Sequence, residues 1–172
     1  MPRRPIIAGI QSRSPEDDPA AEVGDRFREA MSHWPAGVSL VTVRDEDQIL
    51  GITVSAFLSV SLDPPLALVS IGVDAGILPS LHDVGRFSVS ILAEDHTRLA
   101  SGFAKGIPWE QGIFPEQGDP LLKDAIAGIV CTLEEDHPAG DHRLIIGRVQ
   151  RVELGRERPS LVYHRREYLS AG

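Results

Sequence analysis

The sequence has little of what several common classes of protein require. Its 172 residues include one cysteine, Cys131, so no disulfide can form within the chain. Aromatic residues make up only 5%, and the net charge is -8, from 25 acidic and 17 basic residues with no basic cluster. Because a phosphate backbone recruits clustered Lys and Arg, we expect no nucleic-acid partner. Cys131 lies in an apolar run and is expected to be a buried, reduced thiol.

Long hydrophobic runs are also absent. The N-terminal apolar piece, Ile6 to Ile10, is shorter than the core of a signal peptide, about 7–15 residues, and far shorter than a membrane span of about 20. We therefore expect no membrane partner and a cytoplasmic location.

Several motifs of catalytic and nucleotide sites are missing as well. There is no G-x-G-x-x-G after a strand and no G-x-x-x-x-G-K-[ST], so the sequence does not favour a nucleotide held in the Rossmann or P-loop manner. A G-x-S-x-G elbow and an H-E-x-x-H motif are missing too. The sequence therefore gives little support to a hydrolase, and we expect no metal ligand.

Composition along the chain predicts a tail and one domain. Residues 11–21 are rich in Ser, Pro and Asp and have too little apolar surface to offset the entropy of ordering, so we expect a flexible tail over 1–21. The remaining residues, 22–172, match the size of a single domain. From Glu22 to Trp34 the apolar residues follow helical spacing, which predicts an amphipathic helix that Pro35 ends.

The rest of the chain alternates short apolar segments with turns rich in Gly and Pro. This pattern predicts a helix over 78–84, a second helix capped by Asp95, and a turn at 137–142. Few helices and many short strands favour a mainly β fold, a closed or partly closed antiparallel barrel. The predicted strands cover residues 37–43, 49–53, 66–71, 87–92, 125–135, 143–154 and 160–163.

One segment, Gly51 to Pro65, carries hydroxyls at Thr53, Ser55, Ser59 and Ser61. In an extended strand these four side chains would line one face, with the small Ala56 leaving room for a ligand. Such a surface suits a planar, hydrogen-bonding ligand. The alternative is a Ser/Thr-rich edge strand that faces solvent and binds nothing.

Eight motifs follow one another along the chain: Phe27–Met31, Gly37–Val38, Gly51–Pro65, Gly85–Val89, Phe103–Lys105, Gly140–His142, Ile146–Val149 and Pro159–Tyr163. Taken together and in this order, they resemble the short-chain flavin reductases of two-component monooxygenases over residues 27–168. The resemblance implies a flavin reductase-like split β-barrel with Greek-key topology, a homodimer, and hydride transfer from NADH or NADPH to FMN or FAD. It also implies a separate monooxygenase that uses the reduced flavin.

The resemblance further implies the residues of the site. Lys105, on the other wall of the flavin site, would neutralise a phosphate. His142 and Tyr168 would contact the nicotinamide nucleotide. Hydride transfer between two cofactors needs no obligatory acid or base, so we expect no catalytic residue in the strict sense. The flavin ring and ribityl chain would contact Thr53, Val54, Ser55, Ala56, Ser59 and Val60, and the phosphate or adenine side would contact Asp74, Ala75, Gly76, Ser80 and Leu81.

The residues alone leave alternatives open. Without the family, Lys105 could equally be a solvated lysine at a helix end, and His142 a surface residue of a turn. Tyr168 could be an aromatic residue that only closes the end of the barrel. The segment between Lys105 and Leu121 is shorter than in the family and carries Trp109, which leaves the nicotinamide position and the choice between FMN and FAD open. Two other functions remain: a flavin-binding module or carrier without NAD(P)H turnover, and a flavoenzyme that acts on its own organic substrate.

Overall fold

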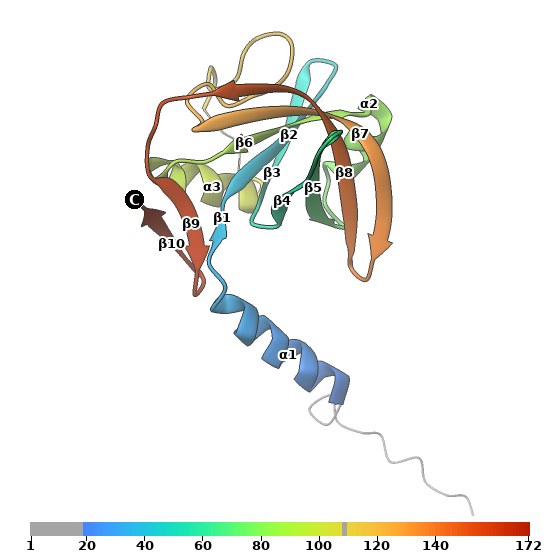
Figure 1. The fold of residues 1–172 in the computed structure, drawn as a ribbon, viewed down its shortest axis with the longest axis vertical. Helices are drawn as coiled ribbons and strands as arrows, with labels where there is room; N and C mark the ends of the chain where they lie inside the picture. Colours follow the sequence, from blue (N-terminus) through green and yellow to red (C-terminus); the bar gives the residue numbers. More distant parts are fainter. Residues whose placement is uncertain (1–18, 108–109) are drawn as a thin grey trace, which may run out of the picture. The chain divides into compact units, whose positions relative to one another are not determined.

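The computed structural model describes residues 19–107 and 110–172 (Figure 1). The chain divides into two compact units, residues 1–34 and 35–172. In the first unit, α1 (Pro19–Ser32) carries the predicted apolar stripe. The helix begins three residues before the predicted Glu22, because a proline such as Pro19 is tolerated in the first turn, and it ends at Ser32, two residues before the predicted Trp34. The rest of the predicted tail lies outside the described residues.

The second unit is built mainly from two antiparallel sheets. A seven-stranded sheet has the order β3-β2-β6-β7-β8-β5-β4, and a three-stranded sheet has the order β1-β9-β10. The edge strands β3 and β4 follow each other in the chain, so the large sheet curls into a split barrel, which confirms the predicted fold class. The strands are β1 (Ala36–Gly37), β2 (Ser39–Asp45), β3 (Gln48–Val54), β4 (Phe57–Leu62), β5 (Pro65–Gly72), β6 (Arg86–Ile91), β7 (Ala127–Ala139), β8 (His142–Leu154), β9 (Ser160–His164) and β10 (Glu167–Ala171).

Two helices and a short 3-10 turn accompany these sheets. The helix α2 (Leu78–Val84) has the predicted bounds, and α3 (Thr97–Ala104) follows a 3-10 turn at Glu94–His96. Asp95 lies in that turn and does not cap α3, whose N-cap is His96, so the predicted cap is wrong. Within the described ranges, no helix is both long and apolar enough to cross a membrane.

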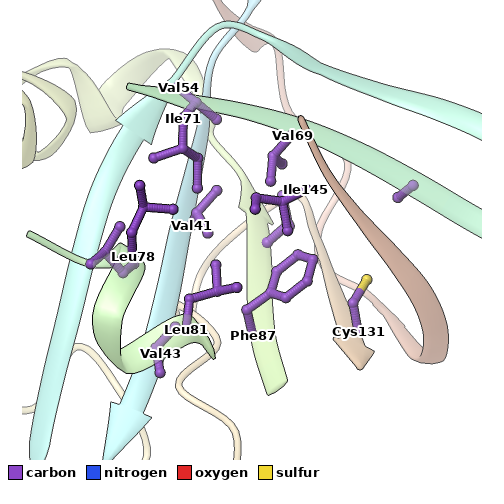
Figure 2. Packing of buried hydrophobic residues seen from close by; sticks show 13 residues of the cluster. Val41, Val43, Val54, Val69, Ile71, Leu78, Leu81, Phe87, Cys131 and Ile145 are labelled. Atoms are coloured by element: carbon purple, nitrogen blue, oxygen red, sulfur yellow. The ribbon is translucent and has the colours of Figure 1, made fainter. Parts of the chain in front are cut away.

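The barrel interior holds the first hydrophobic core (Figure 2). Side chains from β2, β5, β6 and β8 meet there, and α2 adds Leu78 and Leu81. Cys131 is fully buried in this core, as predicted, and burial raises the pKa of its thiol to about 11. The helix α2 therefore belongs to the core and is fixed to the strands that carry the site.

A second core lies between the barrel strands and α3, and it includes Leu40, Ala100 and Phe103. A Cβ atom at Gly51 would lie 2.5 Å from Cε1 of Phe103. Because a real Cβ never approaches so closely, β3 needs glycine there for α3 to pack against it. Phe114 and Leu122, from the loop after α3, complete this core.

The loop after α3 is fastened to the barrel strands by several hydrogen bonds. Arg44 donates through Nε to the carbonyl of Gly118 at 2.8 Å, and Thr42 donates through its hydroxyl to the carbonyl of Pro120 at 2.6 Å. Asp119 accepts two hydrogen bonds from Arg86. The described part of the segment between Lys105 and Leu121 is thus held against the barrel, while Trp109 lies outside the described residues.

The long hairpin of β7 and β8 differs from the prediction. Both strands continue to the tip, and the turn shrinks to Gly140 and Asp141, where Gly140 has a φ of 64°. The predicted six-residue turn is therefore wrong, because pairing between the strands persists through polar residues. The last strand, β10, was also missed.

Candidate functional site

The hydroxyl-bearing segment forms a corner between two strands. β3 ends at Val54, β4 begins at Phe57, and a β-bulge shifts the register between Ser59 and Ser61. The four hydroxyls therefore do not line one face, and that expectation is wrong. What the structure offers instead is a corner at Ser55 and Ala56, where the chain passes from one edge of the sheet to the other.

The predicted flavin contacts around this corner differ in exposure. Thr53 donates through its hydroxyl to the carbonyl of Ala100 at 2.8 Å, so its side chain faces α3. Val54 is buried in the barrel core. The exposed members of the predicted set are Ser55, Ala56, Ser59 and Val60.

Backbone hydrogen bonds bring this corner close to two other parts of the predicted site. The carbonyl of Ala56 accepts from the N–H of Ser70 at 3.0 Å, and two residues later Gly72 pairs with His142 across β5 and β8. The N–H of Val73 then donates to the carbonyl of Asp141 at 3.0 Å. The corner, the end of β5 and the hairpin tip thus lie next to one another.

The loop before α2 completes this group. Asp74 and Gly76 are exposed and Ala75 is half-buried. A Cβ atom at Gly76 would meet nothing within 4 Å, so the loop leaves open space for a ligand. Exposed hydroxyls, backbone N–H groups and small residues are the donors and the shape that a flavin requires, so the residues present fit that group.

Two predicted residues on α2 have their side chains engaged elsewhere. Ser80 donates through its hydroxyl to Oδ2 of Asp45 at 2.6 Å, and Leu81 is fully buried in the core. In this arrangement both side chains fasten α2 to the barrel. A contact of either one with a flavin stays a prediction.

His142 is the first residue of β8, and its side chain is 48% exposed at the hairpin tip. Its Nδ1 lies 2.7 Å from Oδ1 of Asp141. A hydrogen bond from His142 holds the pKa of the Asp141 carboxyl below its usual value. Because a carboxylate only accepts, we assign the proton to Nδ1, which leaves Nε2 as the ring nitrogen that can face a ligand.

Lys105 and Tyr168 lie along α3, away from the corner at Ser55 and Ala56, within this chain. Ala100 contacts Thr53 and Phe103 packs against Gly51, so α3 runs antiparallel to β3 and Lys105 lies toward the start of that strand, away from the corner. Lys105 lines a cavity of about 640 Å³ along α3.

Tyr168 packs against the second core. Its ring lies 5.4 Å from that of Tyr163, and its hydroxyl interacts with Ser101 of α3. Burial raises the pKa of this hydroxyl. Within one chain, the structure therefore does not bring Tyr168 next to His142.

Sequence reasoning missed a polar cluster behind the hairpin tip. Asp136 of β7 accepts a bifurcated hydrogen bond from the Nε–H of Arg143, with its two carboxylate oxygens at 2.7 and 2.8 Å, and lies 2.5 Å from Nε2 of His82 on α2. No short motif marks this cluster, because its three members come from different elements. In the described part of the chain, no group of three or more His, Cys, Asp and Glu residues is placed to hold a metal ion.

Comparison with known proteins relates the chain to flavin enzymes. The family described as flavin reductase like domain matches residues 31–172. The reductase component of 4-hydroxyphenylacetate 3-monooxygenase from Thermus thermophilus is 40% identical over 144 residues, which cover 84% of this chain and 94% of that protein. An NADH-dependent flavin reductase from a Rhodococcus species is 38% identical over 142 residues, or 80% of this chain and 81% of the relative.

A solved structure of a flavin reductase has the same fold as this chain. The flavin reductase PheA2 in its native state superposes with a TM-score of 0.80 at 35% identity, covering 86% of this chain and 97% of that one.

Proposed function

Since the chain belongs to the flavin reductase-like domain family, we propose that it is an NAD(P)H:flavin oxidoreductase, which transfers hydride from a reduced nicotinamide nucleotide to FMN or FAD. The observation that carries this function is the match over residues 31–172 together with a 38% identical relative that is named an NADH-dependent flavin reductase. The aligned region covers 80% of this chain and 81% of that relative.

We place the flavin on the corner at Ser55 and Ala56, between Ser59 on one side and the loop from Asp74 to Gly76 on the other. The exposure of these residues and the open space at Gly76 support this placement. When bound there, the flavin supplies the ring that accepts the hydride. The chain's own task is to hold that ring with hydroxyls and backbone N–H groups, since positioning is what two-cofactor hydride transfer requires.

We assign His142 to the nicotinamide nucleotide. Its place beside Gly72 and Val73 puts it next to the flavin-side loop, with Nε2 directed away from Asp141. Lys105 remains the proposed partner of a phosphate. Tyr168 remains a proposed contact of the nucleotide, although within one chain it lies with α3.

We propose further that the protein acts as a homodimer. Three apolar side chains on the edge strand β4 are exposed, Leu58, Val60 and Leu62, and a second copy packed against this edge would cover apolar surface of this kind. A second copy would also allow Lys105 and Tyr168 of one protomer to reach the site of the other. Sedimentation velocity with and without flavin tests the oligomeric state, and a monomer at working concentration would contradict it.

The reduced flavin would serve a separate monooxygenase, as expected for a relative of a monooxygenase reductase component. A cytoplasmic location stays a proposal.

The test of the function is steady-state oxidation of NADH and NADPH with FMN, FAD and riboflavin as acceptors. Turnover with at least one pair supports the oxidoreductase. Binding of flavin without any nucleotide oxidation would favour the carrier function instead.

A further inference from the structure

The cluster at Asp136 joins three elements that surround the proposed site. Asp136 lies on β7, Arg143 follows His142 on β8, and His82 comes from α2, which begins directly after the loop from Asp74 to Gly76. The side chain of Asp136 is only 15% exposed. One partly buried carboxylate thus links the hairpin to the helix.

The register of the strands shows that this cluster cannot touch a ligand at His142. Asp136 lies opposite Ile145 in the ladder, and Arg143 lies opposite Ile71. Both isoleucines belong to the barrel core, and paired residues share a face, so Asp136 and Arg143 point inward. Neighbouring residues on a strand point to opposite faces, which puts His142 on the outer face.

The carboxylate of Asp136 is held in its charged form. Burial opposes the charge, but hydrogen bonds from Arg143 and His82 outweigh burial and keep the pKa of this carboxyl below its usual value. Charge-assisted hydrogen bonds of this kind are about twice as strong as neutral ones. Removal of the charge would weaken both links and leave Arg143 partly buried without its main partner.

We propose that Asp136 is a positioning residue for nucleotide binding: through Arg143 it fixes the strand that carries His142, and through His82 it fixes α2 and the loop that precedes it. The distance between the nicotinamide side and the flavin side of the site is then set by a carboxylate that contacts neither ligand. This inference rests on the proposed function, because His142 is taken there as the nicotinamide contact.

The first experiment compares Asp136→Asn with a matched control. Glu134→Gln removes a similar carboxylate, paired with Arg148 on the same hairpin but away from the tip. We expect Asp136→Asn to raise the KM for NADH by about fivefold to tenfold, with the Kd of riboflavin unchanged, whereas Glu134→Gln changes neither quantity. Equal effects of the two variants, or a loss of kcat and thermal stability with an unchanged KM, would overturn the proposal.

The second experiment tests whether Asp136 acts through His142. In a double-mutant cycle, Asp136→Asn should add no further rise in KM once His142 is already alanine, because the positioned side chain is gone. Additive effects would overturn the proposal.

Hydrogen exchange followed by mass spectrometry needs no turnover. Asp136→Asn should speed exchange in peptides that contain Val73 and the hairpin tip, and Glu134→Gln should not. If the wild type oxidises neither NADH nor NADPH, the proposed function fails. Hydrogen exchange still decides the structural half of the inference, namely that Asp136 holds the hairpin tip and the loop before α2 in place. Unchanged exchange in Asp136→Asn would overturn that half by itself.

Discussion

Replacement of His142 by alanine removes one side chain from the hairpin tip and leaves its surroundings intact. The imidazole contacts Asp141, whose side chain is 92% exposed, so water can replace that partner. The residue lies outside both hydrophobic cores. We therefore expect the variant to fold with the stability of the wild type, and any change in kinetics reports the lost contact with a ligand.

The size of the effect follows from the exposure of His142. A hydrogen bond at a half-exposed position contributes about 0.5–1.5 kcal/mol, because water competes for both groups. The upper end of this range corresponds to about a tenfold change in an equilibrium constant. The KM for the nucleotide should therefore rise by up to about tenfold, while the Kd of the flavin stays the same because Ser55 and Ala56 are untouched.

The assay varies NADH and flavin separately in steady state and adds an independent flavin titration. His137→Ala is the matched control: this histidine lies on the same hairpin, is 54% exposed, and pairs with Glu135 at 2.6 Å. We expect no kinetic change in the control. If His142→Ala leaves the nucleotide KM and kcat unchanged, or if both variants change them equally, His142 is a surface residue and the assignment fails.

Three further substitutions probe other parts of the account. Ser55→Leu puts a bulky side chain on the exposed corner and should weaken flavin binding at least about tenfold in a folded protein. An unchanged flavin titration would show that the ring does not bind at this corner. Lys105→Ala should weaken FMN and FAD more than riboflavin, because the lost contact is to phosphate, whereas equal losses would make Lys105 structural. Asp119→Asn should cost about 1–2 kcal/mol of unfolding free energy near neutral pH, since hydrogen bonds from Arg86 and Arg151 hold the pKa of Asp119 below its usual value. That contribution is complete above the ordinary carboxyl pKa of about 4 and is lost as the pH falls through the lower pKa of the folded protein, so the difference in urea unfolding between the variant and the wild type should shrink as the pH falls below about 4; a constant difference would refute the ion pair.

Elements with strong local signals were predictable. The helix α2 has the predicted bounds because Pro79 lies in its first turn and Gly85 adopts a φ of 65° at its end. The hairpin tip was not predictable in the same way. Residues 134–142 are polar and contain Pro138 and Gly140, which is typical of a loop, yet pairing of β7 with β8 keeps them extended.

The arrangement of the site residues also depends on strand pairing that a local sequence pattern does not reveal. Ser55, Asp74 and His142 are close because β5 pairs with both β4 and β8, and no local pattern contains that order. The separation of Lys105 from this group depends on α3 packing against Gly51. The resemblance names the residues, but it does not say which of them one chain can bring together.

The most direct test of the central claim is rapid anaerobic mixing of NADH with the protein and FMN. We expect loss of the oxidised flavin's absorbance in step with oxidation of NADH, at equal stoichiometry, and a slower reaction with His142→Ala at subsaturating NADH. Flavin that binds but keeps its oxidised spectrum with NADH and with NADPH, for FMN, FAD and riboflavin alike, would contradict it.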